Sequence, residues 1–199
     1  MQSAEIQDTV KKIKRGFSLQ MNGVASGSMR EKGINSYLNW GIQLPALRKI
    51  AEEYGKDYDL AIALWKENVR ECKILATLIM PAERMDGQML SLWMEQTQTQ
   101  EIAEYAAFNL YQYVADASIY GYLWIASDNT LVQICGYNLL ACLFKKGSQP
   151  SERDINEFID QAIAALSDKA VGVKHAAMNS LNTFAAVSYT HLTLPTILR

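Results

Sequence analysis

The sequence of 199 residues contains no apolar run near the roughly 18 residues that a membrane-spanning helix needs. Its first residues, MQSAEIQDTVKKIKRGF, carry charges where a signal peptide would have an apolar block. The three cysteines, Cys72, Cys135 and Cys142, fit neither a disulfide framework nor a metal site, and His175 and His191 have no partner at ligand spacing. We therefore expect a cytoplasmic protein in a reducing compartment, with no membrane partner, no metal and no cofactor.

The alternation of polar and apolar residues that marks a half-buried strand is also absent before the last residues. Helical periodicity runs through nearly every segment, as in the stripe of Ile6, Val10, Ile13 and Phe17. Helices recur in pairs every roughly 30 to 40 residues, a period near that of HEAT-type arrays. This pattern predicts an all-α fold, a right-handed solenoid of antiparallel HEAT-like helix pairs over residues 1–186. Its expected core includes Ile74, Leu75, Leu78, Ala106, Leu110, Cys135, Leu139 and Leu181.

The last residues, 187–199, have no helical stripe and little charge. Their sequence, VSYTHLTLPTILR, resembles the translated read-through of a sequencing adapter. We therefore expect a non-native or disordered tail and leave these residues out of functional reasoning.

Three short motifs go beyond periodicity. They are MNG followed by SGSMR, the Gly41-Ile42 turn before PALRKIA, and LW followed by RECKILATLI. Together they resemble the N-terminal half of the DNA alkylation repair (AlkD-like) family, of which this chain would be a divergent member. The resemblance implies an array of HEAT-like helical repeats with a concave, basic groove that holds duplex DNA.

The active members of that family excise N-alkylated purines without extruding the base, using aromatic walls around an aspartate. Their Trp-Asp-x-x-Asp segment falls on QEIAE in this chain, so Gln100 replaces the tryptophan and Glu104 the catalytic aspartate. Glu104 is thus the candidate catalytic acid, since a carboxylate can stabilise the positive charge that develops on the sugar. Alternatively, Glu101 and Glu104 only favour the positive end of a helix, which Thr97 and Gln100 would begin as a capping box.

Two further parts of the active family pattern have no equivalent here. An arginine pair and a late Trp-x-x-Arg segment fall on or near uncharged residues: Gln133, Ile134, Asn179 and Asn182. No tryptophan follows Trp124 and no arginine lies between Arg84 and Arg153, so a small shift of the alignment restores neither feature.

Positive charge is missing from the middle of the chain. Residues 85–144 contain no Lys or Arg and six acidic residues, namely Asp86, Glu95, Glu101, Glu104, Asp116 and Asp128. Duplex binding depends on Lys and Arg contacts to phosphates, so this block would repel DNA if it faced a groove. Cations for nucleic-acid binding must then come from outside it, and the candidates are Lys11, Lys12, Arg15, Arg30, Lys32, Lys169 and Lys174.

Three functions remain open. The first is a non-catalytic family member that binds nucleic acid or a protein on its concave face. The second is an active glycosylase with a divergent site on Glu104, and the third is a protein-interaction scaffold without a DNA role. We favour the first, with either weakly bound duplex DNA or a protein on the concave face as the partner, because the charge pattern and the missing residues argue against excision.

Overall fold

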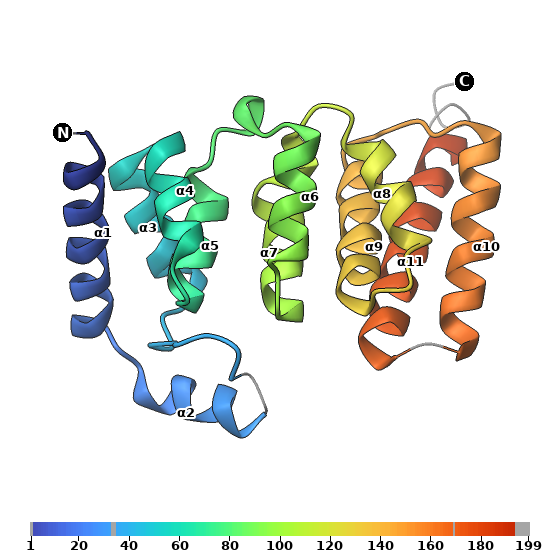
Figure 1. The fold of residues 1–199 in the computed structure, drawn as a ribbon. Helices are drawn as coiled ribbons and strands as arrows, with labels where there is room; N and C mark the ends of the chain where they lie inside the picture. Colours follow the sequence, from blue (N-terminus) through green and yellow to red (C-terminus); the bar gives the residue numbers. More distant parts are fainter. Residues whose placement is uncertain (1, 33–34, 169, 194–199) are drawn as a thin grey trace. The chain divides into compact units, whose positions relative to one another are not determined.

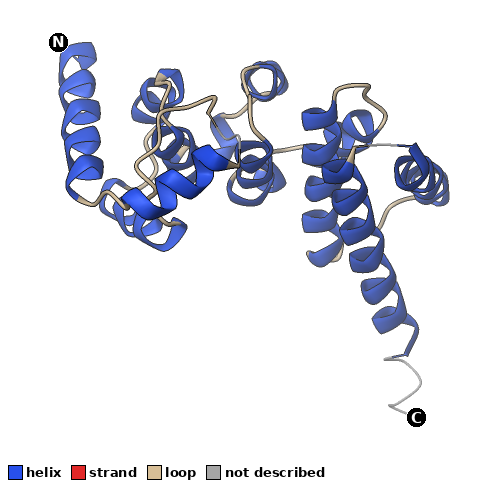
Figure 2. Cartoon of the chain, turned by 90° about the horizontal axis from the view of Figure 1, so that it is seen from below, coloured by secondary structure: helices blue, strands red, loops and turns tan. Residues whose placement is uncertain are grey.

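The computed structural model describes residues 2–32, 35–168 and 170–193. These residues contain helices and loops but no strand, and an isolated parallel bridge between Leu38 and Val69 is their one β-type pairing. Figure 1 shows the helices in chain order, and Figure 2 shows the loops that join them. The expected all-α fold is confirmed. None of the described helices combines the length and apolarity that crossing a bilayer requires.

The chain divides into two compact units, residues 1–90 and 91–199, with the boundary inside α6. The first unit holds α1 (Gln2–Leu19), α2 (Gly23–Glu31), α3 (Leu44–Tyr54), α4 (Tyr58–Lys66), α5 (Arg70–Ile79), the 3-10 helix η1 (Ala82–Arg84) and the start of α6 (Gly87–Glu95). The second holds α7 (Gln100–Asn109), the 3-10 helix η2 (Tyr111–Tyr113), α8 (Ala117–Ile125), α9 (Thr130–Lys145), α10 (Glu152–Asp168) and α11 (Val171–Thr193).

In the first unit, α1 packs on α4, and both α3 and α4 pack on α5. The stripe predicted for the first helix provides the contact, since Val10, Ile13 and Phe17 are buried. Local signals set the helix ends: Gly55, at φ 67°, ends α3, and the Asp57 carboxylate begins α4 by accepting a hydrogen bond from a backbone N–H.

A buried carboxylate organises the loop before α3. Glu71 is fully buried, and its Oε1 accepts hydrogen bonds from the backbone N–H groups of Trp40, Gly41 and Ile42 at 3.2, 3.0 and 3.3 Å. The Arg70 guanidinium donates to the same oxygen at 3.1 Å and to the Ile42 carbonyl at 3.0 Å. The negative charge is thus compensated where water cannot reach it, and the loop is held against α5.

The same loop holds α2. The Asn22 N–H donates to the Trp40 carbonyl at 2.8 Å, and the Ser26 hydroxyl donates to the Asn39 carbonyl at 3.0 Å. Gly41 has φ 73°, and a Cβ there would lie 2.4 Å from the Asn22 carbonyl oxygen. Only glycine fits this position, because both the backbone conformation and the closeness of α2 exclude a side chain.

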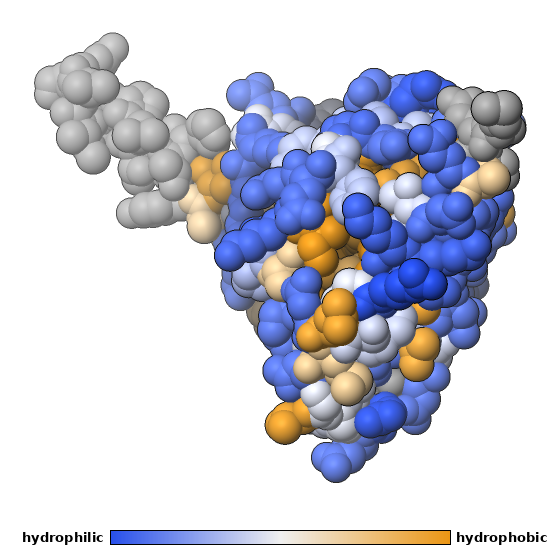
Figure 3. All heavy atoms as spheres, turned by 90° about the vertical axis from the view of Figure 1, so that its left-hand side faces the viewer, coloured by the Kyte–Doolittle hydropathy of each residue, from blue (hydrophilic) through white to orange (hydrophobic). Residues whose placement is uncertain are grey.

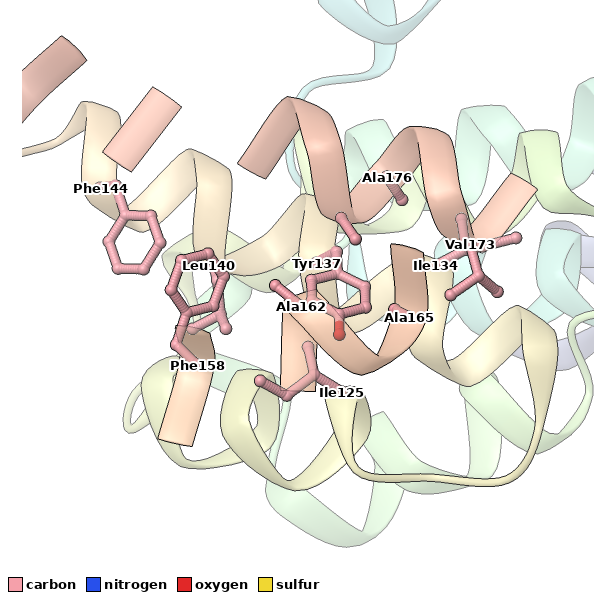
Figure 4. Close-up of a cluster of buried hydrophobic side chains, with 11 residues drawn as sticks. Ile125, Ile134, Tyr137, Leu140, Phe144, Phe158, Ala162, Ala165, Val173 and Ala176 are labelled. Carbon is pink, nitrogen blue, oxygen red and sulfur yellow. The ribbon is translucent and has the colours of Figure 1, made fainter. Parts of the chain in front are cut away.

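The second unit is built around α9, which packs against α7, α8 and α11. Aromatic and aliphatic side chains of α9 meet those of α8, α10 and α11 in one cluster, shown in Figure 4. In this cluster the rings of Phe144 and Phe158 lie 5.1 Å apart, in an edge-on arrangement that aromatic rings favour. Because neighbouring helices share the cluster, no helix pair of this unit buries its apolar face alone.

Six of the eight predicted core residues are buried: Ile74, Leu75, Ala106, Leu110, Cys135 and Leu139. For Leu78 and Leu181 the prediction was wrong, since both are half-buried. Leu78 lies in the last turn of α5, and Leu181 is partly buried and packs against the hydrophobic cluster of the second unit. Periodicity identifies the apolar side of a helix but does not tell how far its neighbours cover each turn.

The end of the chain continues α11 as far as Thr193, so this helix includes the first residues of the segment 187–199. Residues 194–199 lie outside the described residues. That 187–199 is a non-native tail stays a prediction.

We expect Glu71→Gln to lower the free energy of unfolding by about 3–5 kcal/mol, because it leaves the buried Arg70 guanidinium without its counter-charge. Urea unfolding followed by circular dichroism measures this. Glu52→Gln, at an exposed glutamate of α3, should change stability by less than about 0.5 kcal/mol. Equal effects of both substitutions would contradict the role assigned to Glu71.

We also expect all three thiols to resist alkylation in the native protein. Burial raises the pKa of Cys142 to about 11 and raises the pKa values of Cys72 and Cys135 further. At pH 8 a thiol of pKa near 11 is ionised in roughly one molecule in a thousand, and only the thiolate reacts. Mass spectrometry after iodoacetamide treatment should find labelling only in denaturant. Rapid native labelling would show that the thiols are accessible.

Candidate nucleic-acid interface

The candidate acid lies on α7, which begins differently from the prediction. Thr99 is the residue that caps this helix, its hydroxyl accepting a hydrogen bond from the Ile102 N–H at 3.4 Å. The predicted cap at Thr97 was wrong: its buried hydroxyl donates to the Trp93 carbonyl at 2.8 Å, inside the preceding turn. Both threonines suit a cap by sequence, and the packing of α6 decides between them.

The Glu104 carboxylate has a neutral neighbour where the resemblance calls for an aromatic wall. Gln100 Nε2 donates to Glu104 Oε1 at 2.8 Å, one helical turn away. The other end of the Gln100 amide faces α11, where a Cβ on Gly172 would lie 2.6 Å from Gln100 Oε1. Gln100 therefore lies between the carboxylate and the start of α11. An amide in this place offers hydrogen bonds, but no π face for a cationic purine.

The positions where the family has arginines do not form a cationic site. Gln133 is buried, and its side chain donates to the Ile125 carbonyl at 3.1 Å, while Ile134 belongs to the core cluster. Asn179 and Asn182 lie on α11, and both are exposed. Gln133 and Ile134 thus pack α9 against its neighbours, and Asn179 and Asn182 add no charge.

All six acidic residues of segment 85–144 lie at the surface. Asp86, Glu95, Asp116 and Asp128 are at least partly exposed, and Glu101 and Glu104 are half-buried. Asp86 also begins α6, because its carboxylate accepts a hydrogen bond from the Met89 N–H at 2.8 Å. The acidic block is therefore a solvated negative surface and not a set of buried ion pairs.

Three of the predicted cations share α1. Lys11 pairs with Asp8 at 3.0 Å, and both side chains are exposed. Lys12 and Arg15 are exposed as well, and the ion pairs found among the described residues do not include them. Two unpaired cations therefore remain on this helix for a ligand phosphate. Lys14, between them, is bound to Glu67 at 2.6 Å and ties α1 to the end of α4.

The other predicted cations are distributed. Arg30 is exposed in the last turn of α2, and Lys32 follows as its C-cap, at the end of α2 away from α1 (Figure 1). Lys174 is half-buried on α11 in the second unit. Lys169 lies outside the described residues. The structure thus brings Lys11, Lys12 and Arg15 together on one helix, whereas Lys174 belongs to the other unit.

Some basic residues that add to the sequence charge do not reach solvent. Lys73 is buried, and its ammonium donates to the Trp65 carbonyl and lies 4.5 Å from the Trp65 ring centroid and 5.7 Å from that of Tyr37. Burial lowers the pKa of Lys73, and the aromatic faces offset part of the desolvation cost of its charge. Lys73 therefore packs inside the first unit, where a phosphate in solution does not reach it.

Two surface hollows border α8, one of about 370 Å³ and one of about 430 Å³. Ile119 and Tyr122 line the smaller and Leu123 the larger, and Glu104 lines neither. Burial, with the negative charges of Asp154 and Glu157, raises the pKa of Tyr122 to about 12. Its phenol therefore stays protonated at neutral pH, as a donor beside acidic groups.

Sequence reasoning missed an exposed apolar corner between α1 and α2. Leu19, Met21 and Val24 lie there. The signal in the sequence was that Leu19 follows Lys12 and Arg15 at helical spacing, on the side of α1 opposite the buried stripe. Among the described residues, no group of three or more His, Cys, Asp or Glu side chains is arranged to hold a metal ion.

The model of the DNA alkylation repair enzyme family matches residues 17–190. One solved structure has a TM-score of 0.78 at 18% identity, covering 93% of this chain and 79% of the other. It is described as a new family of proteins related to the HEAT-like repeat DNA glycosylases with affinity for branched DNA structures. The low identity limits this likeness to the fold, which is of the HEAT-like repeat type. Comparison with curated protein sequences found no match.

The matched region begins in α1, ends in α11 and includes both units. It contains the Gly41 turn and the buried Glu71, whose motifs carry the resemblance in the sequence. The helical architecture agrees with this match along the described chain. The chain belongs to the DNA alkylation repair enzyme family.

Proposed function

We propose that this chain is a non-catalytic family member that binds nucleic acid through its first unit. The observation that carries the proposal is the state of Glu104, which is hydrogen-bonded to Gln100 where a catalytic aspartate would stand within aromatic walls. Excision needs a carboxylate placed against the sugar and π faces that favour the cationic base. The surroundings of Glu104 offer an amide and the start of α11 instead.

The distribution of charge supports binding by the first unit. Residues 1–90 contain 13 Lys and Arg and 11 Asp and Glu, whereas residues 91–199 contain 6 and 10. The unpaired Lys12 and Arg15 belong to the first unit, and the acidic surface belongs mostly to the second. A polyanion is attracted to the former and repelled by the latter.

The nature of the nucleic acid is suggested by the structural neighbour, whose affinity is for branched DNA structures. Branched DNA is therefore the proposed ligand of the present chain. Branched DNA offers phosphates of several arms close together, so a compact group of cations can contact more than one strand. Linear duplex should bind weakly, because the cations of the first unit are few.

A protein-binding function is the second candidate, and one observation favours it. Ile119 and Leu123 of α8 are each 63% exposed, lie one helical turn apart and border the two hollows. The acidic residues of segment 85–144 surround this stripe in the sequence. A basic amphipathic helix is the partner that would suit such a surface.

We expect the protein to release neither 3-methyladenine nor 7-methylguanine from alkylated duplex DNA above background. The physical reason is that Gln100 stands where the resemblance places a tryptophan, and that it holds the Glu104 carboxylate in a hydrogen bond. Chromatography of the released bases measures this, with Glu101→Gln as the matched control for Glu104→Gln. Excision that Glu104→Gln abolishes and Glu101→Gln preserves would make Glu104 the functional acid and overturn the proposal.

We expect DNA binding to weaken steeply with salt and to depend on α1 and α2. Changing Lys12, Arg15 and Arg30 together to Ala should reduce the slope of log affinity against log salt by about one for each phosphate that is no longer neutralised. Fluorescence anisotropy of labelled duplex and branched DNA at several salt concentrations gives this slope. The control is Lys145→Ala, an exposed lysine at the end of α9 that should leave the slope unchanged. Salt-resistant binding that survives the triple change would contradict the assignment.

A further inference from the structure

The corner between α1 and α2 exposes three apolar side chains within six residues. Leu19 is 87% exposed, Met21 60% and Val24 86%, and Leu19 and Val24 are the most exposed large apolar residues of the described chain. Single exposed apolar residues are ordinary, but a group of them on one turn indicates a surface that contacts something. Figure 3 shows this side of the first unit, where hydrophobic residues interrupt a mostly hydrophilic surface towards its lower end.

This corner is held in place from behind. The Gln20 N–H closes the end of α1 by donating to the Gly16 and Phe17 carbonyls, at 3.2 and 3.1 Å. The Phe17 ring lies 5.7 Å from that of Trp40, whose carbonyl accepts from the Asn22 N–H. The corner is thus fixed to the loop that Glu71 organises, so a ligand need not order it on binding.

Positive charge lies on both helices that meet at the corner, on one side of α1 and at the far end of α2. Residues 11–32 contain six Lys and Arg and a single acidic residue, Glu31. Lys12, Arg15 and Leu19 follow at spacings of three and four residues, so they share one side of α1. An apolar corner with cations along one side of α1 is complementary to a ligand that has both apolar faces and a negatively charged backbone.

We propose that Leu19, Met21 and Val24 form an apolar platform that stacks on the base-pair face exposed at a branch point in DNA. The proposal rests on the proposed function and names the part of branched DNA that the first unit would recognise, which is the exposed base-pair face. Base-pair faces inside a linear duplex are covered by their neighbours, whereas a branch leaves one uncovered. Aliphatic and methionine side chains are used in this way by proteins that unstack or cover base steps. The cations of α1 and α2 contact the phosphates on either side of the branch.

The test compares the wild-type chain with a variant carrying Leu19→Ser, Met21→Ser and Val24→Ser. Anisotropy titrations use a three-way junction and a linear duplex of equal length, with 2-aminopurine at the branch as a second signal. We expect the wild type to prefer the junction and the variant to lose about tenfold in junction affinity, the lower end of the loss seen when one aromatic side chain that stacks on a base is removed. Duplex affinity and the salt slope should stay unchanged, and the 2-aminopurine response should disappear.

The matched control is Ile119→Ser with Leu123→Ser, which removes exposed apolar residues from the other unit and should keep the preference for the junction. Circular dichroism and urea unfolding verify that both variants are folded. Equal affinity of the wild type for junction and duplex, or an unchanged preference in the triple variant, overturns the platform and leaves nucleic-acid binding standing. Absence of binding to either DNA overturns the proposed function itself. The wild type could instead self-associate through this corner. If sedimentation shows that the triple variant loses self-association while it keeps the preference for the junction, the corner contacts a second copy of the chain and the platform is overturned.

Discussion

The buried carboxylate of Glu71 is the contact on which the first unit depends. One oxygen accepts three consecutive backbone N–H groups and the Arg70 guanidinium, so it fixes the path of the loop at residues 40–42. That loop in turn holds α2 through the Trp40 carbonyl and the close approach at Gly41. The apolar corner and its neighbouring cations are therefore presented by a rigid support, although they lie at the surface. Burying the Glu71 carboxylate costs desolvation free energy, and in return its hydrogen bonds order the loop at residues 40–42, about thirty residues earlier in the chain.

In the second unit, hydrophobic packing has the role that the carboxylate has in the first. The helix α9 contacts three others, and its interior face carries core residues where the active family pattern has arginines. Gln133 shows the consequence, since it is buried and bonds a carbonyl of α8 instead of facing a ligand. At position 100, where the resemblance places a tryptophan, the exposed Gln100 side chain lies between the Glu104 carboxylate and the start of α11.

The two units therefore differ in what they can offer a ligand. The first has unpaired cations on the outer side of α1, and the second has a surface of carboxylates and an apolar stripe on α8. Charge of one sign attracts a polyanion over nanometre distances at low salt, whereas apolar surface acts only on contact. Under the proposed function, the first unit captures nucleic acid.

The sequence by itself determined the helical class and the family, since helical periodicity and the motif RECKILATLI, which contains Glu71, are local signals. It also determined the absence of Lys and Arg from residues 85–144. Only the tertiary structure decided which cations reach solvent. Lys12 and Lys73 contribute equally to the sequence charge, but Lys73 is buried against the rings of Trp65 and Tyr37. It likewise decided that Thr99 caps α7, that Leu78 is half-covered, and that Leu19 faces outward from a corner fixed by a loop about twenty residues later. These outcomes depend on contacts between segments distant in the chain, and a local pattern contains no information about what will pack against it.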